Sequence, residues 1–366
     1  MCRSEELILK IDRPFHKVHI SILLFISLMI QIHENYPLKP LNTFAIEASA
    51  CWFTEINNED DLAELLRDTR WNSIDRLILG GGSNMLFTKD FKGLVVRMNI
   101  PGIRKETKGT DIFVTAGGGV VWNDLVNYCV DNELAGMENL SLIPGSVGAS
   151  PIQNIGAYGV ELMDIFYSCR AFEIATGTIR IFSKEDCLFS YRDSIFKNRL
   201  KGKYIITEVT YKLSSDFHPR VSYGAITQEL EKRGISNPTI KNISEVVSYI
   251  RVSKLPDPST IGNAGSFFKN PLMDINDFIQ LQSDFPDIVY YKVGDAQIKL
   301  AAGWLIEQCG WKGRVVGNTG TWKNQALVLV NHGNATGSEV FYLSESIIAD
   351  VKKHFGVVLE REVNII

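Results

Sequence analysis

The spacing of apolar and polar residues predicts alternating helices and strands from residue 42 onward. Residues 60–69 have the apolar spacing of a helix, and Asn58 before them is a suitable N-cap. Residues 122–133 form a second amphipathic pattern that is typical of a helix. Further helices are expected near residues 243–254, 275–284, 299–309 and 338–355.

Short apolar runs between these helices predict strands. A run from residue 76 and another from residue 111 each end in three consecutive glycines. Residues 169–183 are typical of a hairpin that turns at Thr176 and Gly177. Further strands are expected at residues 93–98, 204–213 and 357–365. Since several connections are expected to be antiparallel, the pattern predicts an α+β fold and not a regular βαβ array.

The composition narrows the classes of function. The chain has 366 residues, which is long for one hydrophobic core and sufficient for two or three domains. Its net charge is -4 and no basic stripe is present, so we expect no nucleic-acid partner. The six cysteines are scattered without a C-x-x-C pair, which is typical of reduced thiols. No histidine lies between His33 and His218, so no metal site is expected.

The N-terminal segment admits more than one interpretation. Residues 20–30 form an apolar run that follows several basic residues, as in a signal peptide, but no small-x-small cleavage site follows. The run is also shorter than the roughly 20 residues that span a bilayer, so no membrane insertion is expected. We favour the interpretation that translation starts at Met29, which would make residues 1–28 an over-extended reading frame.

Three glycine-rich loops, at residues 80–82, 117–119 and 145–159, follow apolar segments. Glycine lets backbone N–H groups converge on an anion such as a diphosphate. The Rossmann pattern fails, because the third glycine that it requires is replaced by Met85 in one loop and by Trp122 in another. Any one loop is better explained as a tight turn, but three together favour a buried cofactor.

Six segments carry a specific resemblance. They occur between about Leu41 and Glu362 and resemble, in the same order, the UDP-N-acetylenolpyruvoylglucosamine reductase family. The resemblance implies a PCMH-type FAD-binding fold of two small subdomains, followed by a substrate-binding domain. The segments are LGGGSN (79–84), NLSLIPGSVGASPIQNIGAYG (139–159), FSYRDSIFK (189–197), KLPDP (254–258), GNAGSFFKNP (262–271) and LAAGWLIEQCG (300–310).

The resemblance also implies a domain organisation and a set of FAD contacts. Residues 1–40 would be an N-terminal extension, 41–217 the FAD-binding domain, and 218–366 a substrate-binding domain whose last strand returns to the active site. The polar stretch at 214–224 marks the expected boundary. FAD would be held, largely through backbone groups, by Gly80, Gly81, Gly82, Ser83, Asn84, Gly145, Gly148, Ser150, Gln153 and Ile155.

The implied reaction has two halves, with FAD and NADPH as cofactors. NADPH reduces FAD, and hydride from the reduced flavin then converts the enolpyruvyl ether of a UDP-sugar into a lactyl ether, giving UDP-N-acetylmuramate for peptidoglycan. Hydride addition leaves an enolate, so the site needs a cation to hold the charge and an acid to deliver a proton. The resemblance assigns these catalytic tasks to Arg192, Ser266 and Glu362.

Each catalytic assignment has a plain alternative. Arg192 is suited to bind a carboxylate through two hydrogen bonds, but it could also pair with the adjacent Asp193. Ser266 lies between small residues and two phenylalanines, and it could simply belong to a turn that leads into a strand. Glu362 would share a strand face with Glu360, so the motif alone distinguishes the two carboxylates.

The resemblance further assigns the UDP group to four residues, of which Lys299 could equally be a surface lysine at a helix start. Tyr223 marks the longer type of the family, in which a tyrosine loop folds over UDP. Asn364 stands where relatives have an arginine, which puts an extra basic contact there in doubt. The four substrate-binding candidates are Tyr223, Lys254, Asn270 and Lys299.

Two other functions remain open. One is a different PCMH-type FAD oxidoreductase that acts on a sugar or lactone, although many of these tether FAD through a histidine that this chain lacks between residues 34 and 217. The other is a nucleotide-binding module without catalysis. Under the favoured interpretation we expect a cytoplasmic monomer whose partners are the UDP-sugar substrate and NADPH.

Overall fold

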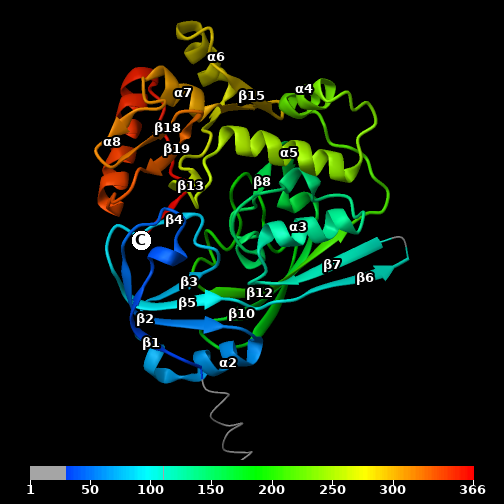
Figure 1. The fold of residues 1–366 in the computed structure, drawn as a ribbon, viewed down its shortest axis with the longest axis vertical. Helices are drawn as coiled ribbons and strands as arrows, with labels where there is room; N and C mark the ends of the chain where they lie inside the picture. Colours follow the sequence, from blue (N-terminus) through cyan, green and yellow to red (C-terminus); the bar gives the residue numbers. More distant parts are fainter. Residues whose placement is uncertain (1–29, 110) are drawn as a thin grey trace, which may run out of the picture.

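The computed structural model describes residues 30–109 and 111–366. Its N-terminal part is a four-stranded sheet, drawn in blue and cyan in Figure 1. Strand β5 pairs in parallel with both of its neighbours, so this sheet is more parallel than the sequence pattern predicted. In order across the sheet the strands are β1 (His33–Pro37), β2 (Ser49–Ile56), β5 (Phe91–Met98) and β3 (Arg76–Leu79), and helix α2 (Glu59–Arg67) follows β2 in the chain.

The second sheet is antiparallel and carries the central helices. Helix α3 (Trp122–Asp131) packs on it through Trp122, whose ring lies edge-on to Tyr211. Helix α5 (Ile240–Lys254) lies over α3 (Figure 1). In order across the sheet the strands are β11 (Ile179–Ser183), β10 (Phe166–Glu173), β12 (Tyr204–Leu213), β7 (Asp111–Gly117) and β6 (Ile103–Lys108).

The C-terminal part contains two more sheets, drawn in yellow to red. The larger consists of β13 (Gly262–Ser266), β19 (Gln325–Asn331), β18 (Thr319–Trp322) and β17 (Val315–Val316). The smaller consists of β14 (Leu272–Asp274), β16 (Gln297–Leu300) and β15 (Tyr290–Val293). The remaining α-helices of the described residues are α4 (Gly224–Lys232), α6 (Ile275–Asp284), α7 (Ala302–Gln308) and the 19-residue α8 (Gly337–Phe355).

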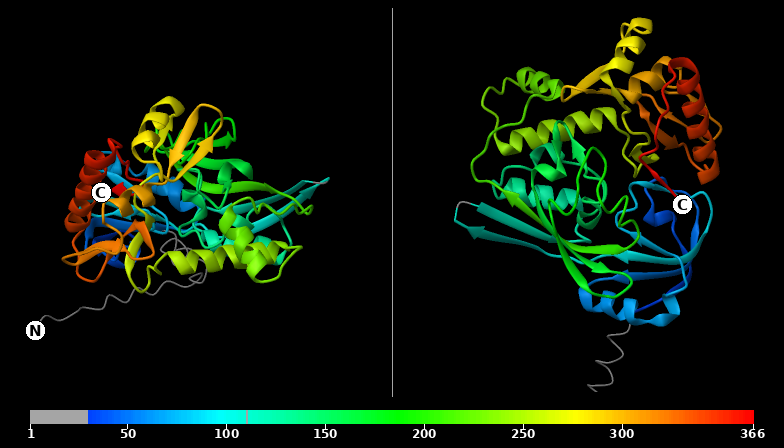
Figure 2. Two further views of the ribbon diagram at one scale, coloured as in Figure 1. Left: turned by 90° about the horizontal axis from the view of Figure 1, so that it is seen from above. Right: turned by 180° about the vertical axis from the view of Figure 1, so that it is seen from behind.

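The C-terminal tail returns to the N-terminal part of the chain. Strand β20 (Asn364–Ile365) pairs in parallel with β4 (Met85–Leu86), which directly follows the first glycine loop. The C-terminus accordingly lies beside the first sheet in both turned views of Figure 2. Residues 362–366 therefore connect the C-terminal part of the fold to the N-terminal part.

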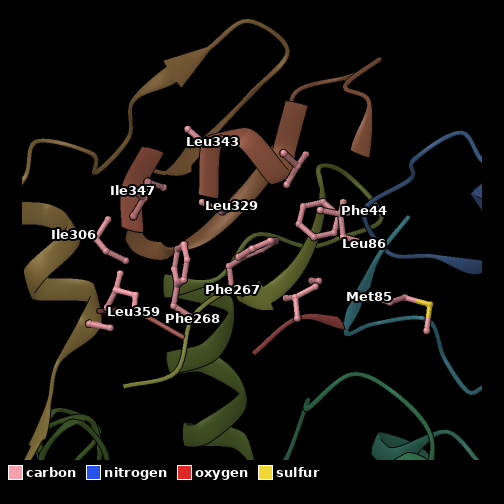
Figure 3. Close-up of a cluster of buried hydrophobic side chains, with 14 of the residues drawn as sticks. Phe44, Met85, Leu86, Phe267, Phe268, Ile306, Leu329, Leu343, Ile347 and Leu359 are labelled. Carbon is pink, nitrogen blue, oxygen red and sulfur yellow. The ribbon is translucent and has the colours of Figure 1, made fainter. Parts of the chain in front are cut away.

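The largest buried cluster joins the N-terminal and C-terminal parts (Figure 3). Phe267 and Phe268 are 0% and 1% exposed, and the Phe267 ring lies edge-on to Phe44 at 6.1 Å between ring centres. Burying such rings stabilises the folded chain by about 1.5–3 kcal/mol each. The two phenylalanines thus anchor the segment that follows Ser266.

Most of the expected elements are confirmed, but one helix was not expected and one expected strand is wrong. The helix after Asn58 begins as predicted, since the Asn58 side chain accepts a hydrogen bond from Asp61 N. Helix α4 was missed, because it directly follows the polar stretch and contains few apolar residues. The strand predicted at 357–365 is wrong: only Asn364–Ile365 form a strand, and a single antiparallel bridge joins Phe268 to Arg361.

Within residues 30–109 and 111–366, no helix is long and apolar enough to cross a membrane. The same residues contain no group of three or more His, Cys, Asp or Glu side chains that is placed to hold a metal ion. The N-terminal segment 1–28 lies outside the described residues. Its interpretation, and the division into domains at residues 40 and 217, stay predictions.

We expect replacement of Gly337 by alanine to lower the free energy of unfolding by about 1–3 kcal/mol, the range for overpacking. Gly337 begins α8, and a Cβ atom there would lie only 1.7 Å from Phe87 O. Gly224→Ala is the matched control, because Gly224 begins α4 and nothing lies within 4 Å of its Cβ position. Urea denaturation measures both variants, and equal free energies would contradict the packing described.

Candidate active site

A pocket lies where the glycine loops at 80–82 and 145–159, the end of β13 and the C-terminal tail meet. It brings together all three predicted catalytic residues, Arg192, Ser266 and Glu362. It also contains nine of the ten predicted FAD-binding residues. These nine are Gly80, Gly81, Gly82, Ser83, Asn84, Gly145, Ser150, Gln153 and Ile155.

One wall of the pocket is backbone, because the two glycine loops pack directly on each other. A Cβ atom at Gly81 would lie 3.0 Å from Gly145 Cα, and one at Gly80 would lie 2.3 Å from Ser146 Oγ. Gly82 has a φ of +61° and packs on Leu41 O, where a Cβ atom would lie 1.9 Å away. At Gly81 and Gly82 the close atoms belong to the backbone, so a side chain is excluded there and these positions present peptide groups.

The tenth predicted residue, Gly148, does not line the pocket. Its backbone N–H donates to Gly118 O at 2.9 Å, and Gly118 N in turn donates to Thr207 O at 2.7 Å. The glycine loop at 117–119 thus supports the glycine loop at 145–159 from behind. The loop at 117–119 is therefore explained by its tight packing, and Gly148 takes part in that packing.

Ser266 reaches the pocket because strand β13 contains a bulge. Asn263 lies opposite Val330 and Ser266 opposite Val328, so β13 has one residue more than its partner over this stretch. Gly265 has a φ of +68°, which suits glycine at a bulge. The Asn263 side chain supports the bend by accepting from Gly265 N at 3.0 Å. The extra residue turns Ser266 toward the pocket, while Phe267 is buried behind it.

Arg192 lies in a two-residue turn with a strained backbone. Ser190 and Asp193 exchange backbone hydrogen bonds across the turn, and Arg192 has a φ of +54°, which costs a non-glycine residue about 1–3 kcal/mol. The guanidinium is held by a hydrogen bond from Nη2 to Gly156 O at 2.7 Å. Asp193 instead accepts from Asn198, so the alternative pairing of Arg192 with Asp193 is not present.

Glu362 forms an ion pair with Arg192, with Oε1 3.2 Å from Nε. The contact is not a hydrogen bond, because Arg192 Nε has no aligned acceptor among the described residues. Gln153 donates to the same Glu362 oxygen at 3.5 Å, and Asn84 donates to Gln153 at 2.7 Å. A chain of polar contacts therefore connects the first glycine loop to the Glu362 carboxylate.

The two tail carboxylates face different partners, contrary to the shared strand face that was expected. Glu362 has a side chain that is only 13% exposed and points to Arg192. Glu360 has a side chain that is 70% exposed and pairs with Lys269. Because the tail forms no regular strand at residues 360–363, the two-residue alternation does not apply there.

Arg251 also lines the pocket, and the sequence analysis missed it. It lies in α5, and its Nε donates to Leu142 O at 3.2 Å. Burial lowers the pKa of the Arg251 guanidinium, and nearby Arg192 lowers it further. An arginine in an amphipathic helix normally marks the solvent face, so the sequence carried no signal for it. Two guanidinium groups at one pocket favour an anionic ligand.

The four predicted UDP-binding residues lie outside this pocket. Tyr223 precedes α4 and packs edge-on to Tyr158, with 5.2 Å between ring centres. Lys254 is exposed at the end of α5. The Asn270 side chain accepts from Ala302 N at the start of α7, at 3.0 Å.

Lys299 is connected to the pocket through Tyr191, the residue before Arg192. Its ammonium lies 4.7 Å from the centre of the Tyr191 ring. Burial lowers the pKa of Lys299 and raises that of Tyr191. Lys299 belongs to strand β16, so it is not the surface lysine at a helix start that was the alternative.

Comparison with known proteins agrees with this geometry. Residues 53–183 match the family model of the FAD binding domain, and residues 257–366 match that of the UDP-N-acetylenolpyruvoylglucosamine reductase C-terminal domain. The solved UDP-N-acetylenolpyruvylglucosamine reductase of Thermus caldophilus has the same fold, with a TM-score of 0.63 and 22% identity over 92% of this chain and 98% of that one. The predicted α+β fold with a PCMH-type FAD-binding part is thereby confirmed.

Full-length relatives are considerably more similar in sequence. The UDP-N-acetylenolpyruvoylglucosamine reductase of Flavobacterium johnsoniae is 46% identical over 92% of this chain and 100% of its own length. That of Amoebophilus asiaticus is 48% identical over the same shares, and that of Pseudomonas aeruginosa is 46% identical over 92% of this chain and 99% of its own. This chain therefore belongs to the UDP-N-acetylenolpyruvoylglucosamine reductase family.

Proposed function

We propose that this chain is an FAD- and NADPH-dependent oxidoreductase of peptidoglycan precursor synthesis in the cytoplasm. It would reduce UDP-N-acetyl-3-O-(1-carboxyvinyl)-glucosamine to UDP-N-acetylmuramate. The observation that carries this proposal is the meeting of Arg192, Ser266 and Glu362, from three separate segments, at one pocket beside two glycine loops. Membership of the family supports it, and favours it over a sugar or lactone oxidase or a non-catalytic module.

The backbone-lined wall fits FAD. Gly81 and Gly145 leave no side chain between the two loops, so peptide groups can approach a diphosphate closely. FAD bound there would accept hydride from NADPH and pass it to the enolpyruvyl double bond. Arg251, with one N–H bonded to Leu142 O, supplies positive charge near this wall.

Arg192 is suited to hold the carboxylate and the enolate charge of the substrate. Its guanidinium lines the pocket and stays charged, so it can offer positive charge and N–H donors to an anionic ligand. The bond from Nη2 to Gly156 O and the ion pair with Glu362 hold the guanidinium in place beforehand. A donor group that is already oriented stabilises developing negative charge without further reorganisation.

Ser266 would deliver the proton. The bulge in β13 presents its hydroxyl to the pocket, and the buried Phe267 and Phe268 fix the chain on its C-terminal side. A serine hydroxyl is ordinarily a weak acid. An enolate is a strong base, so transfer becomes feasible once hydride has been added.

We expect FAD to be bound tightly but without a covalent link, so acid precipitation should release the yellow colour into the supernatant. Gly145→Val should weaken FAD binding at least about tenfold, because a β-branched residue is strained at a φ of +117° and its Cβ would lie 3.1 Å from Ser83 Oγ. Titration of the apoprotein with FAD measures this.

Gly177→Val is the matched control for this substitution. Gly177 has a φ of +67° at the β10–β11 turn, and nothing lies within 4 Å of its Cβ position. It therefore carries similar backbone strain outside the pocket. If both valine variants lose FAD affinity equally, general destabilisation and not the glycine-loop contact is responsible.

Replacement of Ser266 by alanine should separate the two half-reactions. Flavin reduction by NADPH should stay near the wild-type rate, because it needs no proton from Ser266. Reoxidation by the enolpyruvyl substrate should be slower by roughly 10²–10⁴, the usual value of a positioned acid. Single-turnover stopped-flow absorbance measures each half, and normal reoxidation in the variant would rule out Ser266 as the donor.

Lys254→Ala should raise KM for the UDP substrate and leave reduction of the flavin by NADPH unchanged, if Lys254 binds the UDP diphosphate. Lys241→Ala is the control, since Lys241 is also exposed on α5 but lies at the other end of the helix. Steady-state kinetics at several UDP-substrate concentrations distinguish the two variants. Equal damage to both half-reactions would overturn the assignment of Lys254.

A further inference from the structure

Asn139 is a fully buried polar residue that the proposed reaction does not use. It lies in the short helix η3 (Glu138–Leu140) and is 0% exposed. Its side-chain Nδ2 donates two hydrogen bonds, to Tyr158 O at 3.1 Å and to Arg220 O at 2.9 Å. Its Oδ1 has no hydrogen-bond partner among the described residues.

The two carbonyls define the orientation of the Asn139 amide. Only an NH₂ group can satisfy two acceptors, and a reversed amide would direct its oxygen at both carbonyls. The unpaired Oδ1 is a cost to the folded state, since buried acceptors without a partner are unfavourable. The two hydrogen bonds from Nδ2 offset this cost. The Asn139 side chain therefore stabilises the folded chain by joining Tyr158 to Arg220.

The two bonded carbonyls belong to segments that are far apart in the sequence. Tyr158 lies at the end of the second glycine loop, which lines the pocket up to Gly156. Arg220 lies in the irregular segment 214–222, which leads to Tyr223 and helix α4. Asn139 therefore attaches segment 214–223, which ends at Tyr223, to the glycine loop at 145–159.

Other contacts of a different kind also hold this junction. Arg220 pairs with Asp164 at 3.0 Å, but their side chains are 50% and 35% exposed, and such pairs contribute little. The edge-on contact of Tyr158 with Tyr223 packs beside the same junction. Phe217 and Val221 also pack against the buried cluster between α4 and α5. Few backbone hydrogen bonds hold residues 215–222, so the two bonds of Asn139 are a distinct polar part of this attachment.

We propose that Asn139 is a positioning residue for Tyr223. Because its side chain donates to both Tyr158 O and Arg220 O, it holds segment 214–223 against the glycine loop at 145–159. In this way it sets the affinity for the UDP end of the substrate. The inference rests on the proposed function, in which Tyr223 contacts UDP. Asn139 does not line the pocket, and in this proposal it acts through the backbone of segment 214–223.

Trypsin tests the attachment directly, because the bond after Arg220 contains the carbonyl that Asn139 holds. Asn139→Asp replaces the two donors by oxygens that repel both carbonyls. We expect the initial rate of cleavage after Arg220 in the full chain to rise at least about tenfold. Asn331→Asp is the control, since Asn331 is also a buried asparagine, with Nδ2 bonded to Phe44 O, far from segment 214–223 in the fold.

In the control, cleavage after Arg220 should stay at the wild-type rate. Asn139→Ser, which is small and can satisfy only one of the two carbonyls, should give an intermediate rate and serves as the variant if Asn139→Asp does not fold. An unchanged cleavage rate in the folded Asn139 variants would overturn the attachment. A rise of the same size in Asn331→Asp would equally overturn it, because general loosening would then explain both.

A double-mutant cycle tests the link to the substrate. Asn139→Asp or Asn139→Ser should raise KM for the UDP substrate several-fold, with flavin reduction by NADPH unchanged. In a Tyr223→Ala background, the same substitution should change KM less than twofold, because its effect passes through Tyr223. Additive effects in the two backgrounds would overturn the positioning role.

The two proposals fail in distinguishable ways. If Tyr223→Ala alone leaves KM for the UDP substrate unchanged, the assignment of Tyr223 in the proposed function is wrong. If Tyr223→Ala raises KM but the Asn139 variants do not, the assignment of Tyr223 stands and the positioning role of Asn139 is wrong.

Discussion

The site depends on the hydrogen bonds that the C-terminal tail makes on both sides. Glu362 N donates to Phe267 O at 2.8 Å, next to Ser266, and Asn364 N donates to Asn84 O at 3.1 Å, in the first glycine loop. Residues that are about 280 positions apart in the sequence are thereby joined. Thr43 also joins these two parts, since its N–H donates to Gly82 O and its carbonyl accepts from Asn263 N. The tail is nevertheless required to bring Glu362 to Arg192.

The pocket divides its tasks between backbone and charge. Its glycine wall has no side-chain volume to spare, as the close approach of Gly81 to Gly145 shows, and it presents peptide groups to a ligand. Beside this wall lie the guanidinium groups of Arg192 and Arg251 and the carboxylate of Glu362. A neutral, closely fitting wall suits a resident diphosphate cofactor, whereas the charged side suits a carboxylate whose negative charge increases during reaction.

Local signals in the sequence predicted local structure well. The Asn58 cap, the Thr176-Gly177 hairpin and the buried Phe267 and Phe268 all follow from near neighbours in the chain. The motif resemblance predicted the catalytic and FAD-binding candidates that share the pocket, apart from Gly148, whereas the four UDP candidates lie outside it.

Features that depend on distant partners could not be predicted in this way. The tail at 357–365 has the alternation of a strand, but it pairs with Phe268 and Met85 at separate points and forms a strand only at its end. Arg251 and Asn139 gave no signal, because their neighbours Leu142 and Arg220 come from other segments. The four UDP candidates are each plausible chemically, but sequence alone does not say which of them face one ligand.

The absorption spectrum of the purified protein, followed without oxygen, tests the central claim most directly. The account predicts a flavin band that bleaches when NADPH is added and returns when UDP-N-acetyl-3-O-(1-carboxyvinyl)-glucosamine is added. A protein without a flavin band would contradict it. So would a bleached flavin that this substrate leaves reduced and that only oxygen restores.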